Sequence, residues 1–305
     1  MRRHARRVSS LALACFALGA AGAQPAEVAV VKSSEVAAWR PAIEALKRAA
    51  PGHTFTEYDL RNDRATADGV LAGVRGRNPI VVALGPLAAQ LVRTELPQAP
   101  LVYAMVQDPV KLGLAPAPGV TGVAFAIPVK NQIAAFRMVN PRGVRIGVIY
   151  SEENTGPQVA EAEKAAPILR VAVVSRAVTS EREIPGAVRA LLAGDSAVDA
   201  LWMPADPVLL GDQTRRFLIT EMVKAGRPVY ASAPALVAEG ALVSNGPDLV
   251  SVGEQIAELV NRLASGDRSR IDMAVPRAEL VVNRRVAARL KIDLPAEALK
   301  AAKVF

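Results

Sequence analysis

Residues 80–89 read Ile-Val-Val-Ala-Leu-Gly-Pro-Leu-Ala-Ala, and this stretch decides the fold class. Its first five residues are all apolar, as expected of a short strand that is buried on both faces of a sheet. Gly85 and Pro86 interrupt the run, and a helix is predicted over residues 87–94. A buried strand followed directly by a helix is the repeating unit of parallel α/β proteins.

The same unit recurs on both sides of this stretch. Helices are predicted from Pro41 and over residues 65–74, 157–166, 185–192, 213–224 and 249–263, and a further helix ends at Asn140. Strands are predicted at residues 27–32, 53–60, 101–105, 120–124, 145–150, 170–178, 200–204, 228–231, 241–244 and 279–282.

The predicted strands are more numerous than one sheet in a chain of this length usually holds. Right-handed crossovers between them favour doubly wound layers. The half-chains 24–126 and 127–246 share an order of elements without close sequence repetition. We therefore expect an α/β protein with two doubly wound parallel-sheet lobes. A TIM barrel is the competing fold, and the irregular stretch 230–246 argues against its eight regular units.

The N-terminal residues have the three-part pattern of a secretory signal peptide. Four arginines precede an apolar run over residues 8–20, and small residues follow at 21–23. We predict a signal peptide over residues 1–23 and a mature chain that starts at Gln24. A buried N-terminal helix and a lipid anchor at Cys15 are the alternatives. Processing would locate the protein in the periplasm.

Net charge and cysteine content argue against several classes of function. The full chain carries a net charge of +8, and removal of the signal peptide lowers it to +4. Because the basic residues are scattered rather than clustered, nucleic acid is not an expected partner. Cys15 is the only cysteine, so the mature chain would lack thiol chemistry, and no cofactor is expected.

Ligands of open α/β sheets bind beyond the carboxyl ends of the strands, and this rule selects candidate site residues. Many of them are small, hydroxylated or amide-bearing and could hydrogen-bond a solute. The candidates are Lys32, Ser33, Ser34, Gly85, Pro86, Gln107, Asp108, Ser151, Asn154, Asp206, Ser232 and Asn245. The rule also selects Leu87, Glu152, Ala205 and Gly246.

Catalytic and metal-binding motifs do not occur in the sequence. His53 is the only histidine after residue 23, and it stands at the edge of a predicted strand. The sequence contains no phosphate-binding glycine loop or zinc-ligand spacing, and no residue is assigned a catalytic role or a metal. An acid–base carboxylate pair remains as the enzymatic alternative, as in a two-lobed glycosyltransferase, with Glu152, Glu153 and Asp206 as its candidates.

Three blocks of sequence resemble the ABC transporter substrate-binding family that includes tryptophan- and tyrosine-binding proteins. They are residues 83–90 (ALGPLAAQ), 100–110 (PLVYAMVQDPV, followed by GVTGV at 119–123) and 198–206 (VDALWMPAD, followed by PVYAS at 228–232). The ending at residues 280–292 is also similar. The order and spacing of the blocks carry the resemblance.

This resemblance implies a type I periplasmic-binding fold with three crossings, near residues 126–127, 245–247 and 270–274. Lobe 1 would comprise residues 24–126 and 247–270, and lobe 2 residues 127–246 and 271–305. Gly85, Pro86, Gln107 and Asp108 would face the cleft from one side. Ser151, Asn154, Asp206, Ser232 and Asn245 would face it from the other.

The implied function is that of a monomeric, non-enzymatic solute-binding component of an importer, which closes on a small molecule and meets an ABC permease. A ligand-sensing module that signals to a receptor remains the alternative. The chain departs from the family at residues 231–235 (ASAPA), where relatives often carry carboxylates. An amino-acid ligand needs acceptors for its ammonium group, so a polar or anionic ligand paired with Lys32 is expected instead.

Overall fold

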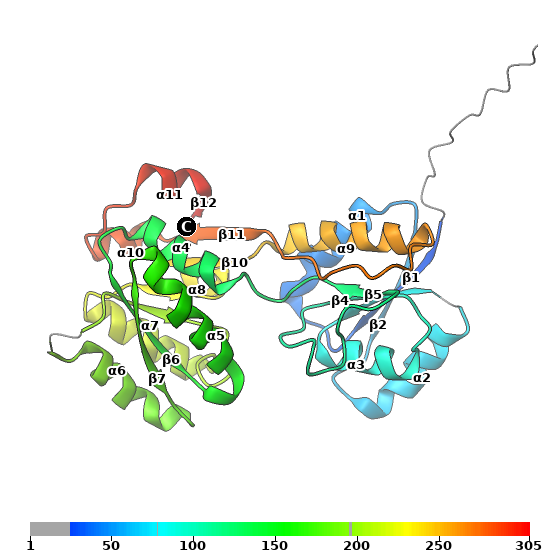
Figure 1. Cartoon of the computed structure of the whole chain (residues 1–305), viewed down its shortest axis with the longest axis horizontal. Coiled ribbons are helices and arrows are strands. Elements are labelled where there is room, and N and C mark those ends of the chain that lie inside the picture. Colours follow the sequence, from blue (N-terminus) through cyan, green and yellow to red (C-terminus); the bar gives the residue numbers. More distant parts are fainter. Residues whose placement is uncertain (1–24, 78, 195–196) are drawn as a thin grey trace, which may run out of the picture.

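The computed structural model describes residues 25–77, 79–194 and 197–305. It contains two α/β lobes that lie side by side and are joined by extended segments (Figure 1). Each lobe has its own sheet, which confirms the two-lobed α/β prediction and excludes a single barrel. The predicted signal peptide and Cys15 lie outside the described residues. Across the described ranges, no helix is long and apolar enough to span a bilayer.

The first lobe is built on a five-stranded parallel sheet with the order β2-β1-β3-β4-β5. Its strands are β1 (Glu27–Lys32), β2 (Thr54–Asp59), β3 (Ile80–Leu84), β4 (Leu101–Ala104) and β5 (Val120–Gly122). Its helices are α1 (Arg40–Ala49), α2 (Arg64–Arg75), α3 (Pro86–Glu95) and α9 (Leu249–Ala264). Helices α1 and α9 cover one face of the sheet, while α2 and α3 cover the other.

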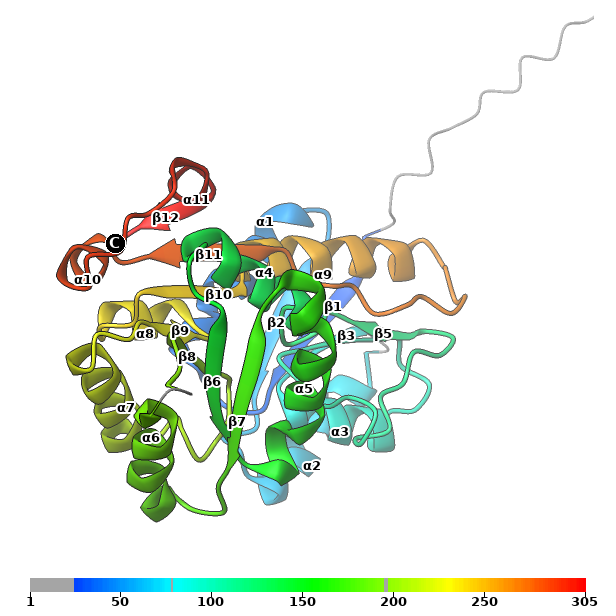
Figure 2. The same ribbon diagram turned by 60° about the vertical axis from the view of Figure 1, so that its left-hand side comes forward.

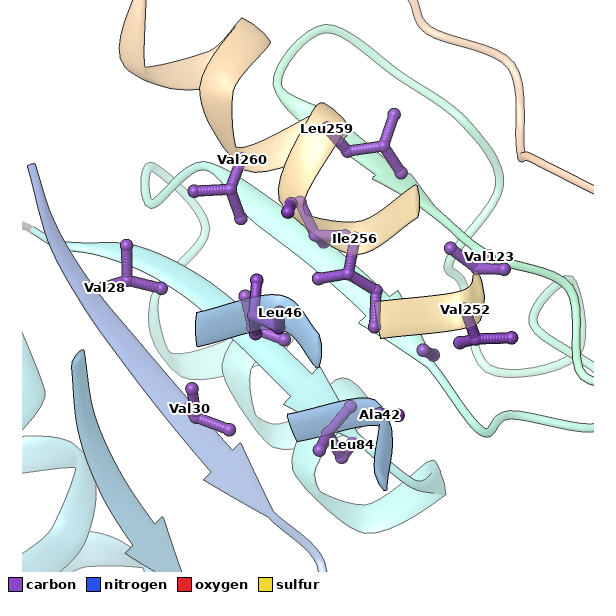
Figure 3. Close-up of a cluster of buried hydrophobic side chains, with 14 of the residues drawn as sticks. Val28, Val30, Ala42, Leu46, Leu84, Val123, Val252, Ile256, Leu259 and Val260 are labelled. Carbon is purple, nitrogen blue, oxygen red and sulfur yellow. The ribbon is translucent and has the colours of Figure 1, made fainter. Parts of the chain in front are cut away.

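Helix α9 reaches the first lobe from a distant part of the sequence because its apolar face fits against α1. Val252 and Ile256 of α9 converge with Leu46 of α1 and Val28 of β1 in one buried cluster (Figure 3). A Cβ atom on Gly253 would lie 2.1 Å from the carbonyl oxygen of Ala42, so only glycine permits this approach. The close contact fixes α9 to the first lobe.

The second lobe contains a seven-stranded sheet with the order β12-β11-β10-β9-β8-β6-β7. Its strands are β6 (Arg145–Tyr150), β7 (Ala172–Ala177), β8 (Ala200–Met203), β9 (Val229–Ala231), β10 (Val243–Pro247), β11 (Ala278–Val282) and β12 (Ala302–Val304). Its helices are α4 (Val129–Val139), α5 (Glu152–Ala165), α6 (Ile184–Leu192), α7 (Asp212–Lys224), α8 (Pro234–Ala238), α10 (Arg284–Arg289) and α11 (Ala296–Ala301). Figure 2 shows α5 beside β6 and β7.

The second lobe differs from the sequence prediction in several places, one of which is the short helix α8 within the stretch 230–246. Strand β11 runs antiparallel to β10, so this sheet is mixed rather than wholly parallel. The predicted tail forms α11 and strand β12, which pairs with β11. Helix α5 begins at Glu152 instead of 157 and contains Pro157, because two glutamates suit its first turn and extend it backward.

Three segments cross between the lobes. The first follows β5 and reaches α4 over residues 123–128, and the second leaves β10 at Pro247 and enters α9. We predicted the third at residues 270–274, but Ile271 lies in the first-lobe core and Ala274 pairs with Val123. The third crossing therefore occupies residues 275–277, and residues 271–274 pack with the first lobe rather than the second.

Candidate ligand-binding site

A cavity of about 420 Å³ lies between the two lobes beside the three crossings, and we call it the interlobe cavity. Its volume is within the usual range for small-molecule sites. The first lobe contributes Ala38, Trp39, Met105, Gln107 and Leu249. The first crossing contributes Phe125, Ala126 and Ile127, and the end of β10, where the second crossing begins, contributes Asn245, Gly246 and Pro247. The second lobe contributes Gln132, Gln158, Pro204, Ala205, Leu210, Arg215, Ser232, Ala233, Pro234, Ala235, Leu236 and Glu239.

The first-lobe wall depends on the contact between Trp39 and Gly85. Trp39 ends a short 3-10 helix (Ala37–Trp39) directly before α1. Gly85 has a φ of +89°, and a Cβ there would lie 2.9 Å from Cη2 of Trp39 and 2.7 Å from Oγ of Ser33. The absence of a side chain at Gly85 thus leaves room for the indole that forms the cavity wall.

The second-lobe wall contains an ion pair between Arg215 of α7 and Glu239. The Nε atom of Arg215 donates to both carboxylate oxygens of Glu239, at 3.0 and 2.8 Å. Its Nη1 atom donates to the carbonyl oxygen of Leu210 at 3.3 Å and to the carboxylate of Asp212. The hydrogen bonds to Glu239 and then Asp212 raise the pKa of Arg215 above its ordinary value. This guanidinium is therefore held by protein groups.

Two amide side chains of the second lobe lie beside the first and second crossings. Gln132 of α4 donates to the carbonyl oxygen of Ile127 at 2.8 Å and accepts from the indole Nε1 of Trp202 at 3.0 Å. Asn245 of β10 donates to the carbonyl oxygen of Asn131 at 3.3 Å. Both amides line the interlobe cavity, so groups that hold the crossings also face the space for a ligand.

Three of the predicted site residues line the interlobe cavity, namely Gln107, Ser232 and Asn245. Ala205 and Gly246, which the same strand-end rule selected, line it as well. These five residues come from both lobes and from the second crossing, and the fold brings them together.

The other first-lobe candidates do not line this cavity. Lys32 is buried and pairs with Glu35 and, at 3.0 Å, with Glu57. Burial alone would lower the pKa of the Lys32 ammonium, but hydrogen bonds to these two carboxylates outweigh burial and raise it. Ser33 is buried, and its Oγ accepts from the backbone N–H of Ala88 in the first turn of α3 at 3.0 Å.

Ser34, Gly85, Pro86 and Asp108 also lie outside the lining of the cavity. Gly85 shapes it indirectly by accommodating Trp39. The carboxylate of Asp108 accepts from the backbone N–H of Lys111 at 3.2 Å, as a turn-forming aspartate does. The expected anionic ligand paired with Lys32 is therefore not supported by the position of that lysine.

The second-lobe candidates Ser151, Asn154 and Asp206 form a structural network. The carboxylate of Asp206 is fully buried and accepts from the N–H of Ser151 at 2.7 Å and its Oγ at 2.9 Å. It also accepts from Thr155 Oγ1 at 2.6 Å and from the N–H of Val208 at 2.9 Å. Asn154 donates to Ser151 Oγ at 2.8 Å. The network ties the end of β6 to the loop after β8.

This network also bears on the enzymatic alternative. Glu152 and Glu153 lie in the first turn of α5, and Asp206 is buried behind them. None of the three carboxylates lines the interlobe cavity. The geometry therefore gives no support to an acid–base pair made from these residues.

The sequence prediction missed Trp39, Gln158 and Arg215, none of which directly follows a strand. It also missed Phe125, although that residue directly follows the predicted strand 120–124. Trp39 carried a signal of another kind. It stands between the charged residues Glu35 and Arg40, outside the apolar face that Ile43 and Leu46 give to α1. The other three come from a crossing and from helical faces, which only the tertiary structure directs toward the cavity.

A second hollow of about 600 Å³ lies on the first lobe alone, beside the starts of β1 and β3. Its charged lining consists of Glu27, Arg75, Arg77, Glu95 and Arg268. It receives no residue from the second lobe and lies at the amino ends of the strands, opposite the edge where α/β sheets bind ligands. We therefore assign the candidate site to the interlobe cavity.

Comparisons with known proteins agree with this geometry. The model of the family described as ABC transporter substrate binding protein matches residues 27–305. A solved ABC domain from Streptococcus pneumoniae in complex with L-Trp is similar, with 22% identity, a TM-score of 0.68, and coverage of 92% of this chain and 99% of that one. No curated protein matches the sequence.

Two further solved structures share the fold, and each match covers 92% of this chain and 99% of the other. A substrate-binding protein with adhesive properties from Clostridium difficile, in its ligand-free, open structure, has 19% identity and a TM-score of 0.80. A conserved domain protein from Vibrio cholerae has 22% identity and a TM-score of 0.67.

Proposed function

We propose that this chain, which belongs to the ABC transporter substrate-binding protein family, is the extracytoplasmic solute-binding component of an importer. The family consists of solute-binding proteins rather than enzymes. The observation that carries the proposal is the interlobe cavity, whose walls come from both lobes and from the crossings between them. A small molecule in this position contacts both halves of the protein at once.

The mechanism is hinge closure. A ligand shifts an open–closed equilibrium only if it binds the closed form more tightly. Trp39 and Gln107 stand on one wall, and Pro204 and Ser232 stand on the other, so closure adds a second set of contacts to the first. The three crossings are short, extended segments that absorb the rotation. The closed form is then presented to a membrane permease.

Export supports the same role. The sequence predicts a signal peptide over residues 1–23, with lipid attachment at Cys15 as the alternative, and either would bring the protein to the outer side of the inner membrane. A monomer suits this role, because one chain supplies both lobes and the cavity between them. The streptococcal relative, which was solved with L-Trp, supports a small molecule as the ligand.

The experiment uses the mature chain and a small-molecule extract of bacterial cells. The protein is mixed with the extract, desalted and denatured, and the released molecules are identified by mass spectrometry. We expect one class of compound to be retained by the wild-type protein and lost in a Trp39→Ala variant. Phe217→Ala, which changes an exposed aromatic residue of α7 outside the cavity, is the matched control and should retain the compound.

Small-angle X-ray scattering then tests closure. We expect the radius of gyration to fall when the retained compound is added back. Permease engagement is tested by the ATPase rate of the transporter encoded beside the gene, which the loaded protein should stimulate. Failure of the extract to yield any retained compound, together with an unchanged radius of gyration, would contradict the proposal.

A further inference from the structure

Only two charged residues line the described part of the interlobe cavity, and they neutralise each other. Arg215 and Glu239 form an ion pair in which Nε of Arg215 donates a bifurcated hydrogen bond to both carboxylate oxygens, and the guanidinium also bonds to Asp212 and to the carbonyl oxygen of Leu210. Their side chains are 19% and 26% exposed, so both have lost much of their hydration. Both charges of this pair are thus compensated by groups of the second lobe.

A ligand with a carboxylate or an ammonium group would enter this cavity without a free counter-charge. Transfer of an ionised group out of water is costly unless it is paired and hydrogen-bonded. To pair with Arg215 or Glu239, the ligand would have to break a charge-assisted hydrogen bond, which is stronger than a hydrogen bond between neutral groups. The cavity therefore disfavours ionic ligands, including zwitterions.

The remaining polar lining is neutral, and besides the hydrogen-bonded amides Gln132 and Asn245 it includes three groups that are available to a ligand. Gln107, Gln158 and Ser232 make no side-chain hydrogen bond to any other residue that the structure describes. An amide donates through nitrogen and accepts through oxygen, and a hydroxyl does both. These groups match a ligand that carries amide, carbonyl or hydroxyl functions.

The apolar lining favours a flat body between the two walls. Trp39 and Phe125 provide aromatic rings on the side of the first lobe and first crossing. Pro204, Pro234 and Leu236 provide apolar surface on the second lobe. Aromatic faces gain most from a planar partner that covers them.

We infer that the ligand is an uncharged, planar, largely apolar molecule with amide-like polar groups, and not a free amino acid. This inference rests on the proposed function, since it names the class of molecule captured in the same cavity. It also replaces the polar or anionic ligand that the sequence led us to expect.

The test keeps the indole ring constant and varies the charged groups on its side chain. Indole-3-acetamide is neutral, indole-3-acetate is an anion, tryptamine is a cation and L-tryptophan is a zwitterion. Isothermal titration calorimetry of the wild-type protein should give an affinity for indole-3-acetamide at least about tenfold higher than for the other three, a difference of about 1.4 kcal/mol. Tighter binding of any charged probe would overturn the inference.

Two opposite variants test whether the ion pair sets this selectivity. Glu239→Gln removes the main partner of Arg215, and we expect the affinity for indole-3-acetate to rise about tenfold. Arg215→Met exposes the Glu239 carboxylate, and the affinity for tryptamine should rise instead. Glu221→Gln, which removes an exposed partner of Lys224 outside the cavity, should change neither affinity. Equal responses of all three variants would count against the inference.

The outcomes separate the ligand class from the proposed function. If a compound is retained from the cell extract but none of the four probes binds, the ligand class is wrong and the solute-binding function stands. If neither the extract nor the probes yield binding, both fail. A retained compound that carries a formal charge would also refute the ligand class.

Discussion

In each lobe a serine after one strand bonds to the segment after the neighbouring strand, but the two lobes use different chemical groups for this connection. Their parallel strands follow equivalent orders, β2-β1-β3-β4 in the first lobe and β7-β6-β8-β9 in the second. A serine follows the equivalent strands β1 and β6, and each bonds to the segment after the neighbouring strand, 55 residues later. Ser33 accepts from a backbone N–H of α3, whereas Ser151 donates to the buried carboxylate of Asp206.

This contrast explains why the strand-end rule found only part of the site. The serines lie at the carboxyl edges of the sheets, as the rule requires, but they tie neighbouring loops together. Groups that face the interlobe cavity, such as Trp39 and Arg215, lie one layer farther from the sheets. In the first lobe the connection is one neutral hydrogen bond to Ser33. In the second lobe it is the buried carboxylate of Asp206, which needs several hydrogen-bond donors.

The largest expected difference in the free energy of unfolding is between variants that remove the connection in one lobe or in the other. Asp206→Ala leaves buried donors from Ser151, Thr155 and Val208 without their acceptor, and we expect a loss of about 3 kcal/mol or more in the free energy of unfolding. Ser33→Ala removes one neutral acceptor and should cost about 1 kcal/mol. Urea denaturation followed by circular dichroism measures both. Equal losses would show that the two connections do not differ in strength.

An intermediate effect is expected at Gly85, for which the second lobe has no counterpart. Gly85→Ala places a Cβ against Ser33 and Trp39 at a positive φ, and we expect about 2 kcal/mol of destabilisation. Ligand affinity should fall with it, because Trp39 is displaced. Gly52→Ala is the matched control, since a Cβ there meets no atom within 4 Å, and its effect should stay within about 0.5 kcal/mol. An unchanged ligand affinity in Gly85→Ala would separate Gly85 from the cavity.

The smallest expected effect on stability comes from the ion pair that Lys32 forms at the end of β1. Lys32 ends β1 and pairs with Glu57, while uncharged Tyr150 ends β6. Burial alone would raise the pKa of Glu57, but hydrogen bonds from Lys47 and Lys32 outweigh it and lower that pKa. A lowered pKa means that the pair stabilises the fold above pH 4.5 and loses this contribution as the pH falls further.

Glu57→Gln should therefore lower the urea midpoint at pH 7, and this effect should become smaller at pH 3, because the wild-type pair loses its contribution as the pH falls through the lowered pKa of Glu57. The difference at pH 7 should stay below about 1 kcal/mol, because the carboxylate is partly exposed. Glu44→Gln, which changes an exposed carboxylate of α1 that lies 3.9 Å from Arg48, is the control and should lower the urea midpoint at pH 7 less than Glu57→Gln does. A constant difference at both pH values would exclude the ion pair as its cause.

The pattern of apolar residues was sufficient to predict most of the helices and strands. The apolar run 80–84 and the helical spacing over 249–263 predicted β3 and α9 within a residue or two. The start of α5 was wrong, since Pro157 was expected to open the helix and instead lies within it. Strand β12 was missed because three residues of tail gain strand structure only by pairing with β11.

The site was less predictable than the fold for a physical reason. Gln107 and Ser232 follow strands, and Asn245 lies within β10, at strand ends that meet at the cleft, so all three line the cavity. Lys32 ends a strand, and Ser151 and Asp206 follow strands, yet each is paired within its own lobe. A sequence shows that a polar group stands at a strand end, but not which neighbour will take its hydrogen bond.

The sequence by itself determined two doubly wound lobes, because the period of apolar residues dictates which segments are buried strands and which are one-sided helices. Only the tertiary structure decided what faces the ligand, because the interlobe cavity is made by segments far apart in the chain. The pairing of Arg215 with Glu239, 24 residues later, leaves that cavity without a free charge among its described residues. Such a balance depends on distances between side chains, which no local pattern records.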